Sequence, residues 1–303
     1  MEENKKDEEY LELPNPPKES DLYLGVLETA GYFAYSQRGS SHVDYNKPCQ
    51  DRCKLVTTKN NVIIAAMADG LGSAALSHYS ANMAVHAVCD YLKNEVEQVS
   101  NVKEKVNQTF LFGVMQKALD EIQAFTEKYQ LLAISFDTTL TIAVYVDKTL
   151  YIAHCGDGGV IVKDEEGKIE LVTKRFNGEK ASSVFPLSAG MTHWQYVELN
   201  RPVESFIMAT DGVLDSLLDD GGKVNESILA PIVDMNLMNR REVKLLRDDY
   251  YNFMNHDVYR HINKDDITLI AVSSLQKKQA LCSSYKEAFI KDKVMTYLKE
   301  KQV

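Results

Sequence analysis

VIIAAMADGLGSA, residues 62–74, is the stretch from which the rest of the chain can be interpreted. It is an unbroken apolar run that ends on Asp69 and continues into a glycine-rich turn, followed by small residues typical of a helix start. An apolar run bounded by polar residues predicts a buried strand, and Gly70 and Gly72 permit a tight turn that side chains would block. A carboxylate at the end of a rigid strand can bind a metal ion, but an Asp-Gly pair is also an ordinary turn signal. The metal interpretation therefore depends on further carboxylates in equivalent positions.

The neighbouring sequence predicts a hairpin that brings a second carboxylate beside Asp69. Residues 53–58 and 62–68 are both rich in β-forming side chains, and the short polar turn 59–61 separates them. Antiparallel pairing places Asp51, at the start of the first strand, next to Asp69, at the end of the second. Two carboxylates are therefore expected side by side at one end of a sheet.

The remaining chain predicts further strands and two long helices. Residues 74–97 and 103–130 carry apolar side chains at helical spacing, so each is expected to form an amphipathic helix. Most of the other strands come in pairs joined by short turns; they are predicted at residues 22–36, 137–146, 149–155, 159–163, 169–173, 203–210 and 267–273. Hairpins with a helix pair between them favour the α+β class, with antiparallel sheets and helices packed outside, over a parallel sheet.

We expect three segments along the chain. Residues 1–20 are charged and contain three prolines, so they are predicted to form a disordered acidic tail. Residues 21–275 are expected to form one domain, in which 174–200 is a long loop and 224–262 is helical and charged. Residues 276–303 are predicted to form a lysine-rich helix that packs on this domain or extends from it.

Composition argues against several classes of function. The chain of 303 residues has a net charge of −10, whereas nucleic-acid binding requires a basic face. No apolar stretch approaches ~20 residues and the N-terminal segment is acidic, so we expect no membrane partner, no secretory signal and a cytoplasmic location. The five cysteines form no paired framework, and Cys49 and Cys53 lack the second pair of ligands that a zinc site needs.

Four aspartates recur at predicted strand ends: Asp51, Asp69, Asp211 and Asp265. Asp69 and Asp211 share one local pattern, in which an apolar strand is followed by Asp-Gly and then by a helix. Clustered carboxylates repel one another unless cations lie between them, and oxygen ligands without histidine or cysteine suit Mg²⁺ or Mn²⁺. Two such ions could clamp a phosphate and activate a water for in-line attack. Four separate turns or helix caps would explain the same residues, but not why the pattern repeats.

These residues belong to a series of motifs that resembles the type 2C metal-dependent protein phosphatases. Six short segments occur in the family's order, and six in order are far more specific than any one of them. They are PCQD at 48–51, ADGLGS at 68–73, DTTL at 137–140, CGD at 155–157, MATDGVLD at 208–215 and KDDITL at 264–269. The GSSH run at 39–42 and the GLGS run at 70–73 resemble a bacterial subgroup of that family.

The resemblance implies a fold, a reaction and a set of ligands. The fold is an αββα sandwich of two antiparallel sheets flanked by helices. Asp69 bridges two Mg²⁺ or Mn²⁺ ions and the Gly70 carbonyl adds a ligand. Asp211 and Asp265 hold one metal, and Asp51 acts through metal-bound water. The nucleophile is a hydroxide shared by both ions, which attacks phosphoserine or phosphothreonine in a phosphorylated protein substrate; we expect the enzyme to be a monomer.

Two departures from the family pattern concern contacts to the substrate. Asn46 stands where many members have an arginine that holds the substrate phosphate, so Arg38 or His42 is expected to take that role. Leu71 stands where animal members often have a histidine that acts as a general acid, which bacterial members often lack as well.

A third metal ion is a further open point. Ser135 occupies a position where many bacterial members carry an aspartate for a third metal, and Asp137 could serve instead, or the third site is absent. The resemblance also implies that Asp157 is structural, near the metals but not bound to them, while Asp266 is expected to support the metal site from beside Asp265.

Two other functions remain open from sequence alone. The departures at the arginine and at the third metal suggest a catalytically silent relative that binds phosphoproteins through the same fold, whereas the retained aspartates argue for catalysis. The other alternative is a metal-dependent hydrolase of small phosphorylated molecules. The loop 174–200 would discriminate, because a closed lid suits a small ligand and an open groove suits a protein.

Overall fold

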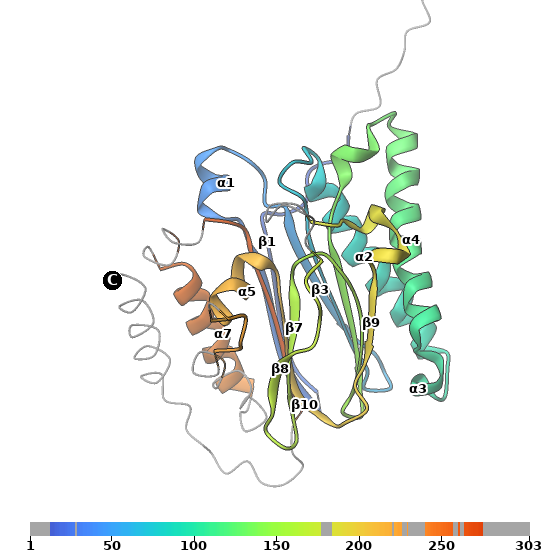
Figure 1. The fold of residues 1–303 in the computed structure, drawn as a ribbon, viewed down its shortest axis with the longest axis vertical. Coiled ribbons are helices and arrows are strands. Elements are labelled where there is room, and N and C mark those ends of the chain that lie inside the picture. Colours follow the sequence, from blue (N-terminus) through green and yellow to red (C-terminus); the bar gives the residue numbers. More distant parts are fainter. Residues whose placement is uncertain are drawn as a thin grey trace, which may run out of the picture.

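The computed structural model describes residues 13–27, 29–176, 184–219, 221–225, 229, 240–256, 260 and 264–274, and the account below concerns these. Two antiparallel sheets lie face to face (Figure 1). The five-stranded sheet has the order β3 (Asp51–Thr57), β4 (Ile63–Asp69), β5 (Leu140–Val146), β6 (Thr149–Cys155) and β9 (Gln195–Glu198). The six-stranded sheet has the order β1 (Ser20–Val26), β2 (Ala30–Gln37), β11 (Ile267–Ser274), β10 (Val203–Ala209), β7 (Gly159–Asp164) and β8 (Ile169–Leu171).

The strand β4 explains the unbroken apolar run that opens the motif at residues 62–74. Its side chains alternate between two cores: Ile63, Ala65 and Met67 face the other sheet, whereas Ile64 and Ala66 face the helices. A strand that is buried on both faces needs apolar residues at every position, so the two-residue alternation of a half-buried strand is lost.

Helices cover the outer face of each sheet, as the expected αββα sandwich requires (Figure 1). α2 (Ser77–Glu97) and α4 (Gln108–Lys128) pack on the five-stranded sheet, and the short α3 (Val102–Lys105) precedes α4. α5 (Asp211–Leu217) and α7 (Arg240–Met254) pack on the six-stranded sheet. The predicted fold class is therefore confirmed.

Three short elements differ from the sequence prediction. Residues 22–36 form parts of two paired strands, β1 and β2, because the chain turns where the amide of Leu27 donates to the carbonyl of Ala30. The stretch after Arg38, predicted as loop, contains a helical turn, α1 (Ser40–Asp44). The predicted irregular segment 174–200 contributes β9, which pairs with the edge strand β6. α1 and β9, with five and four residues, are too short for their hydrophobic periodicity to be read in the sequence.

The structure describes only part of the two terminal segments predicted from the sequence. Within the predicted acidic tail, Ser20 begins β1, the hydroxyl of Tyr79 donates to the carbonyl of Pro14 at 2.8 Å, and Glu19 accepts from the amide of Cys49 at 3.1 Å. The predicted helix at 276–303 and much of the region 224–262 lie outside the described residues. Among the helices that are described, none is both long enough and apolar enough to cross a membrane.

Candidate functional site

Three carboxylates meet at one end of the two sheets. Asp69 ends β4, Asp211 begins α5 directly after β10, and Asp157 lies in the turn between β6 and β7. One ligand oxygen from each lies within 4.8 Å of the other two. Both sheets contribute to this cluster, because β4 belongs to the five-stranded sheet and β10 to the six-stranded one.

Backbone hydrogen bonds fix the position of Asp69. Its amide donates to the hydroxyl of Thr139 at 2.9 Å, and its carbonyl accepts from the amide of Thr139 at 2.7 Å and from the hydroxyl of Thr138 at 3.0 Å. The motif DTTL therefore holds the end of β4 in place, and the Asp69 carboxylate is left to face the cluster.

A cavity of about 660 Å³ opens over the cluster. Asp69, Asp157 and Asp211 line it together with Asp265 and His42. Gly70 also lines the cavity. A Cβ atom at Gly70 would lie only 2.6 Å from the Cβ atom of Ser77, so a larger residue would not fit without movement of its neighbours.

The electrostatics of the cluster favour a bound cation. Burial, and then the charges of Asp51 and Asp211, raise the pKa of Asp69 well above its usual value. Burial, and then Asp157 and Asp265, raise the pKa of Asp211 to about 7. Carboxylates with raised pKa values repel one another when ionised, and divalent cations relieve that repulsion. Because the donor set consists of oxygens, the residues fit Mg²⁺ or Mn²⁺.

Asp51 lies behind the cluster rather than in the cavity lining. It stands opposite Asp69 in the β3–β4 register, as the hairpin predicted, and it is almost completely buried. The hydroxyl of Thr210 donates to its carboxylate at 2.7 Å, and the amide of Thr268 donates to that hydroxyl at 3.1 Å. Burial, and then the charge of Asp266, raise the pKa of Asp51. Asp51 therefore connects the two sheets beneath the site.

Asp265 and Asp266, adjacent in sequence, have different environments. Asp265 lines the cavity, and its carboxylate accepts the amide of Asp266 at 2.8 Å. Burial raises the pKa of Asp265, the hydrogen bond from the Asp266 amide lowers it, and the charge of the Asp266 carboxylate raises it. The Asp265 carboxylate does not belong to the cluster of Asp69, Asp157 and Asp211. Its charge nevertheless raises the pKa of both Asp69 and Asp211.

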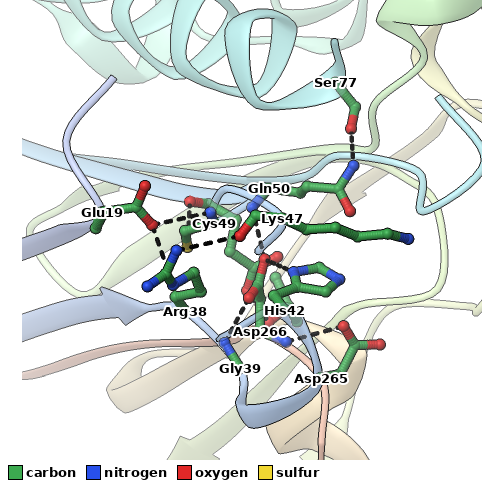
Figure 2. Close-up of polar contacts among 12 residues, drawn as sticks. Glu19, Arg38, Gly39, His42, Lys47, Cys49, Gln50, Ser77, Asp265 and Asp266 are labelled. Carbon is green, nitrogen blue, oxygen red and sulfur yellow. Dashed lines mark hydrogen bonds and ion pairs between the residues drawn. The ribbon is translucent and has the colours of Figure 1, made fainter. Parts of the chain in front are cut away.

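The carboxylate of Asp266 is buried and binds three groups of the segment that leads to Asp51 (Figure 2). It accepts the amides of Gly39 and Gln50, each at 2.5 Å, and lies 2.9 Å from Nδ1 of His42. We call this arrangement the Asp266 hub. It holds both ends of the segment 39–50 and explains why a second aspartate follows Asp265.

His42 is the basic side chain that the Asp266 hub brings to the cavity wall. Its hydrogen bond to Asp266 raises its pKa, although burial acts in the opposite direction. Because Nδ1 faces Asp266, Nε2 is the ring nitrogen that can face a ligand; Figure 2 shows it on the side of the ring away from Asp266.

Arg38, the other residue predicted to contact the phosphate, is directed elsewhere. Its guanidinium lies 3.4 Å from Glu19 and donates to the carbonyl of Lys47 at 3.3 Å (Figure 2). It does not line the cavity, because these contacts hold it at the base of the segment 39–50. Of the two predicted candidates, the geometry supports His42.

Asp137, predicted as a ligand of a third metal, also lies outside this cavity. Its carboxylate accepts the hydroxyl of Ser188 at 2.5 Å, and it lines a separate cavity of about 250 Å³ between α4 and the segment around Leu187. The structure therefore brings Asp137 close to the site through its neighbour Thr138 but does not place it among the clustered carboxylates.

Asp157 lies closer to Asp69 and Asp211 than a purely structural role requires. It was expected near the metals but not bound to them, and the structure places its carboxylate in the cluster. Burial raises its pKa, whereas Arg175, which pairs with Asp215 at 2.7 Å, lowers it. The signal was present, since an apolar strand followed by Gly156-Asp157-Gly158 repeats the strand-then-Asp-Gly pattern of Asp69.

Comparison with known proteins identifies the family of the chain. A family model described as protein phosphatase 2C matches residues 38–247, which is more than half of the chain. No match was found among curated protein sequences.

Several solved structures share the fold. The catalytic domain of the serine/threonine protein phosphatase PstP in complex with two manganese ions has a TM-score of 0.58 and 16% identity, covering 82% of this chain and 99% of that one. RsbX in complex with magnesium has a TM-score of 0.52 and 17% identity, covering 84% and 100%. The phosphatase Stp1 from Staphylococcus aureus has a TM-score of 0.53 and 16% identity, covering 86% and 99%. At these identities the likeness shows the fold.

Proposed function

We infer that this chain, which belongs to the protein phosphatase 2C family, is a metal-dependent serine/threonine protein phosphatase that hydrolyses phosphoserine and phosphothreonine. The observation that carries this function is the cluster of Asp69, Asp157 and Asp211 at the floor of a cavity in the family's fold. A protein that only binds phosphoproteins has no need to keep mutually repelling carboxylates at that place.

Two Mg²⁺ or Mn²⁺ ions fit the donor groups of this floor. We assign Asp69, Asp157 and Asp211 to them directly, with Asp265 and the carbonyl of Gly70 as further donors, since all five residues line the cavity. When bound, the ions supply positive charge for the phosphate and lower the pKa of a water molecule. Asp51, which is buried behind Asp69, holds the floor in position through Thr210 and can reach the ions only through water.

His42 is assigned to the substrate phosphate. Its bond to Asp266 favours the imidazolium, whose Nε2 then donates a hydrogen bond from the cavity wall. This replaces the arginine that the family pattern places near Asn46. The side chain lines the same cavity as the acidic floor, so a phosphate bound in this cavity can contact both His42 and the ions.

We further propose that the substrate is a phosphorylated protein and that the enzyme acts as a monomer in a bacterial cytoplasm. The free cysteines at 49, 53, 89 and 155 are compatible with a reducing compartment, and the family model describes protein phosphatases. The loop 174–200, which was expected to distinguish protein from small-molecule substrates, includes residues 177–183 outside the described part of the chain.

Hydrolysis of a phosphothreonine peptide tests the proposal. Purified protein is assayed with Mn²⁺, with Mg²⁺ and with EDTA, beside the variants Asp69→Asn and Asp157→Asn. Metal-dependent phosphate release that both substitutions abolish is expected. No release with either metal, from protein that calorimetry shows to bind Mn²⁺, would favour the silent phosphoprotein-binding relative. Release from small phosphorylated metabolites alone would favour the small-molecule hydrolase.

A further inference from the structure

The helical turn α1 presents two large apolar side chains to solvent beside the cavity. Val43 is 50% exposed and Tyr45, directly after the turn, is 78% exposed. Ser41 and His42 of the same turn line the cavity. Some residues of α1 therefore line the cavity, and others form the exposed surface beside it.

The backbone of α1 is closed by a capping motif that limits its freedom. Asn46 has a positive φ of 51°, the left-handed conformation that asparagine tolerates at a helix end. The amide of Asn46 donates to the carbonyl of Val43 at 3.1 Å, and the amide of Lys47 donates to the carbonyl of His42 at 2.8 Å. These are the two hydrogen bonds of a Schellman cap, so the turn that exposes Tyr45 is a defined structure.

α1 is also attached to the residues that precede β11. The amide of Ser41 donates to the carbonyl of Lys264 at 3.0 Å, and the hydroxyl of Ser40 donates to the carbonyl of Arg260 at 2.9 Å. These hydrogen bonds add to the contacts of the Asp266 hub. A Cβ atom on Gly39 would lie 2.3 Å from the backbone of Asp265. Because α1 is fixed at several points, its exposed apolar side chains are presented in a preorganised position, which lowers the entropy cost of binding.

We propose that Val43 and Tyr45 form a docking surface for the protein substrate, and that they contact a large apolar side chain next to the phosphorylated residue. The proposal rests on the proposed function. We assign the substrate as the bound partner because the surface is continuous with the cavity through His42. Lys47 is exposed two residues after Tyr45, and its ammonium favours an anionic phosphopeptide here.

A second exposed apolar patch supplies the matched control. Leu132 is 74% exposed and directly precedes Ala133 and Ile134, which line the other cavity together with Asp137. Leu132 is similar to Tyr45 in exposure but belongs to the segment after α4, so the two positions separate docking at α1 from a general effect of surface hydrophobicity.

The test compares two phosphothreonine peptides that differ only in having leucine or alanine next to the phosphothreonine. The wild type is expected to prefer the leucine peptide in kcat/KM. In the double variant Val43→Ser, Tyr45→Ser the ratio of the two kcat/KM values should fall roughly tenfold, as for the loss of an aromatic anchor at an interface. The ratio should stay at the wild-type value in Leu132→Ser. Hydrolysis of p-nitrophenyl phosphate reports whether the metal site is intact.

Several outcomes would overturn the proposal. An unchanged ratio in the double variant would do so, as would a loss that follows Leu132→Ser. A wild type that sediments as a dimer and becomes monomeric in the double variant, with an unchanged ratio, would assign the surface to self-association. If the wild type hydrolyses neither the peptides nor p-nitrophenyl phosphate, the proposed function fails. Fluorescence anisotropy of the same labelled peptides then decides whether the apolar preference and its dependence on Tyr45 exist without turnover.

Discussion

The floor and the wall of the cavity are built in different ways. The floor consists of Asp69, Asp157 and Asp211, which come directly from the ends of strands in the two sheets. The wall consists of α1 with His42, which is held by the carboxylate of Asp266 from a distant part of the sequence. The floor is thus positioned by sheet register and backbone hydrogen bonds, whereas the wall depends on contacts with the segment before β11, in which the Asp266 carboxylate holds His42.

This difference indicates how each part should respond to mutation. A residue of the floor can be changed without moving its backbone, because neighbouring strands still fix it. Loss of Asp266, in contrast, removes the acceptor of two backbone amides and the partner of His42. Substitutions in the floor should therefore affect chemistry and metal binding, and substitution of the hub should affect the geometry of the wall.

The largest effect is expected from the floor. Asp69→Asn should lower kcat/KM with Mn²⁺ roughly 1,000-fold, because it removes a charged donor at the centre of the site. The protein should still fold, with a melting temperature in the presence of EDTA at or above that of the wild type. Asp137→Asn serves as the matched control and should change the rate less than about twofold; a large, metal-dependent loss there would instead indicate a third ion at Asp137.

Next comes the hub that supports the wall. Asp266→Ala should lower kcat/KM roughly 30-fold and the stability of the protein by about 2 kcal/mol, because buried amides of Gly39 and Gln50 lose their acceptor. Mn²⁺ affinity, measured by calorimetry, should change only a few-fold. A loss of metal affinity as large as in Asp69→Asn would show that floor and wall are not separate units.

A smaller effect is expected at His42. His42→Gln should raise KM roughly tenfold, with less change in kcat, and His42→Arg should restore KM because it supplies a permanent cation. The pKa of His42 is raised, so its positive charge is present at low pH and is lost as the pH rises through that value. KM of the wild type should therefore increase as the pH rises above about 6.5, the ordinary pKa of histidine. A KM that rises equally in His42→Arg would assign the pH effect to another group.

The smallest effect concerns the stability of the metal-free protein. The pKa of Asp211 rises from 3.8 to about 7 on folding, so the stability that its protonated form contributes is present at low pH and is lost as the pH rises between about 4 and 7. At pH 8 in EDTA, Asp211→Asn should therefore be more stable than the wild type by ~2 kcal/mol. Urea unfolding at pH 5 and pH 8 measures this; an equal difference at both pH values would exclude ionisation as its cause.

Sequence could predict the floor because its residues are marked by local patterns. The register of the β3–β4 hairpin follows from two apolar runs around a short turn, and it placed Asp51 opposite Asp69 as found. The ends of β4 and β10 were recognisable because each strand stops at Asp-Gly. The same pattern occurs at Asp157, and local sequence alone does not show that its carboxylate joins the cluster, because an Asp-Gly pair is also an ordinary turn signal.

The wall could not be predicted in the same way. The contact between His42 and Asp266 joins two segments that are adjacent only after β2 and β11 have paired. α1 is one helical turn, too short for periodicity, although Asn46 followed by a proline two residues later is a recognisable stop signal. Arg38 was a reasonable candidate by charge alone, and its contacts with Glu19 and Lys47 depend on the docking of the segment before β1.

The position of β11 has a consequence for synthesis on the ribosome. This strand is the last one described, yet it lies in the middle of its sheet, between β2 and β10, and the residues just before it carry Asp265 and Asp266. While the chain emerges, β2 and β10 keep open edges that could pair with other chains, and their closure waits for residue 274. A nascent or truncated chain that ends before β11 consequently lacks both the sheet closure and the hub. The six-stranded sheet and the cavity wall are therefore assembled only after residue 274 has been made.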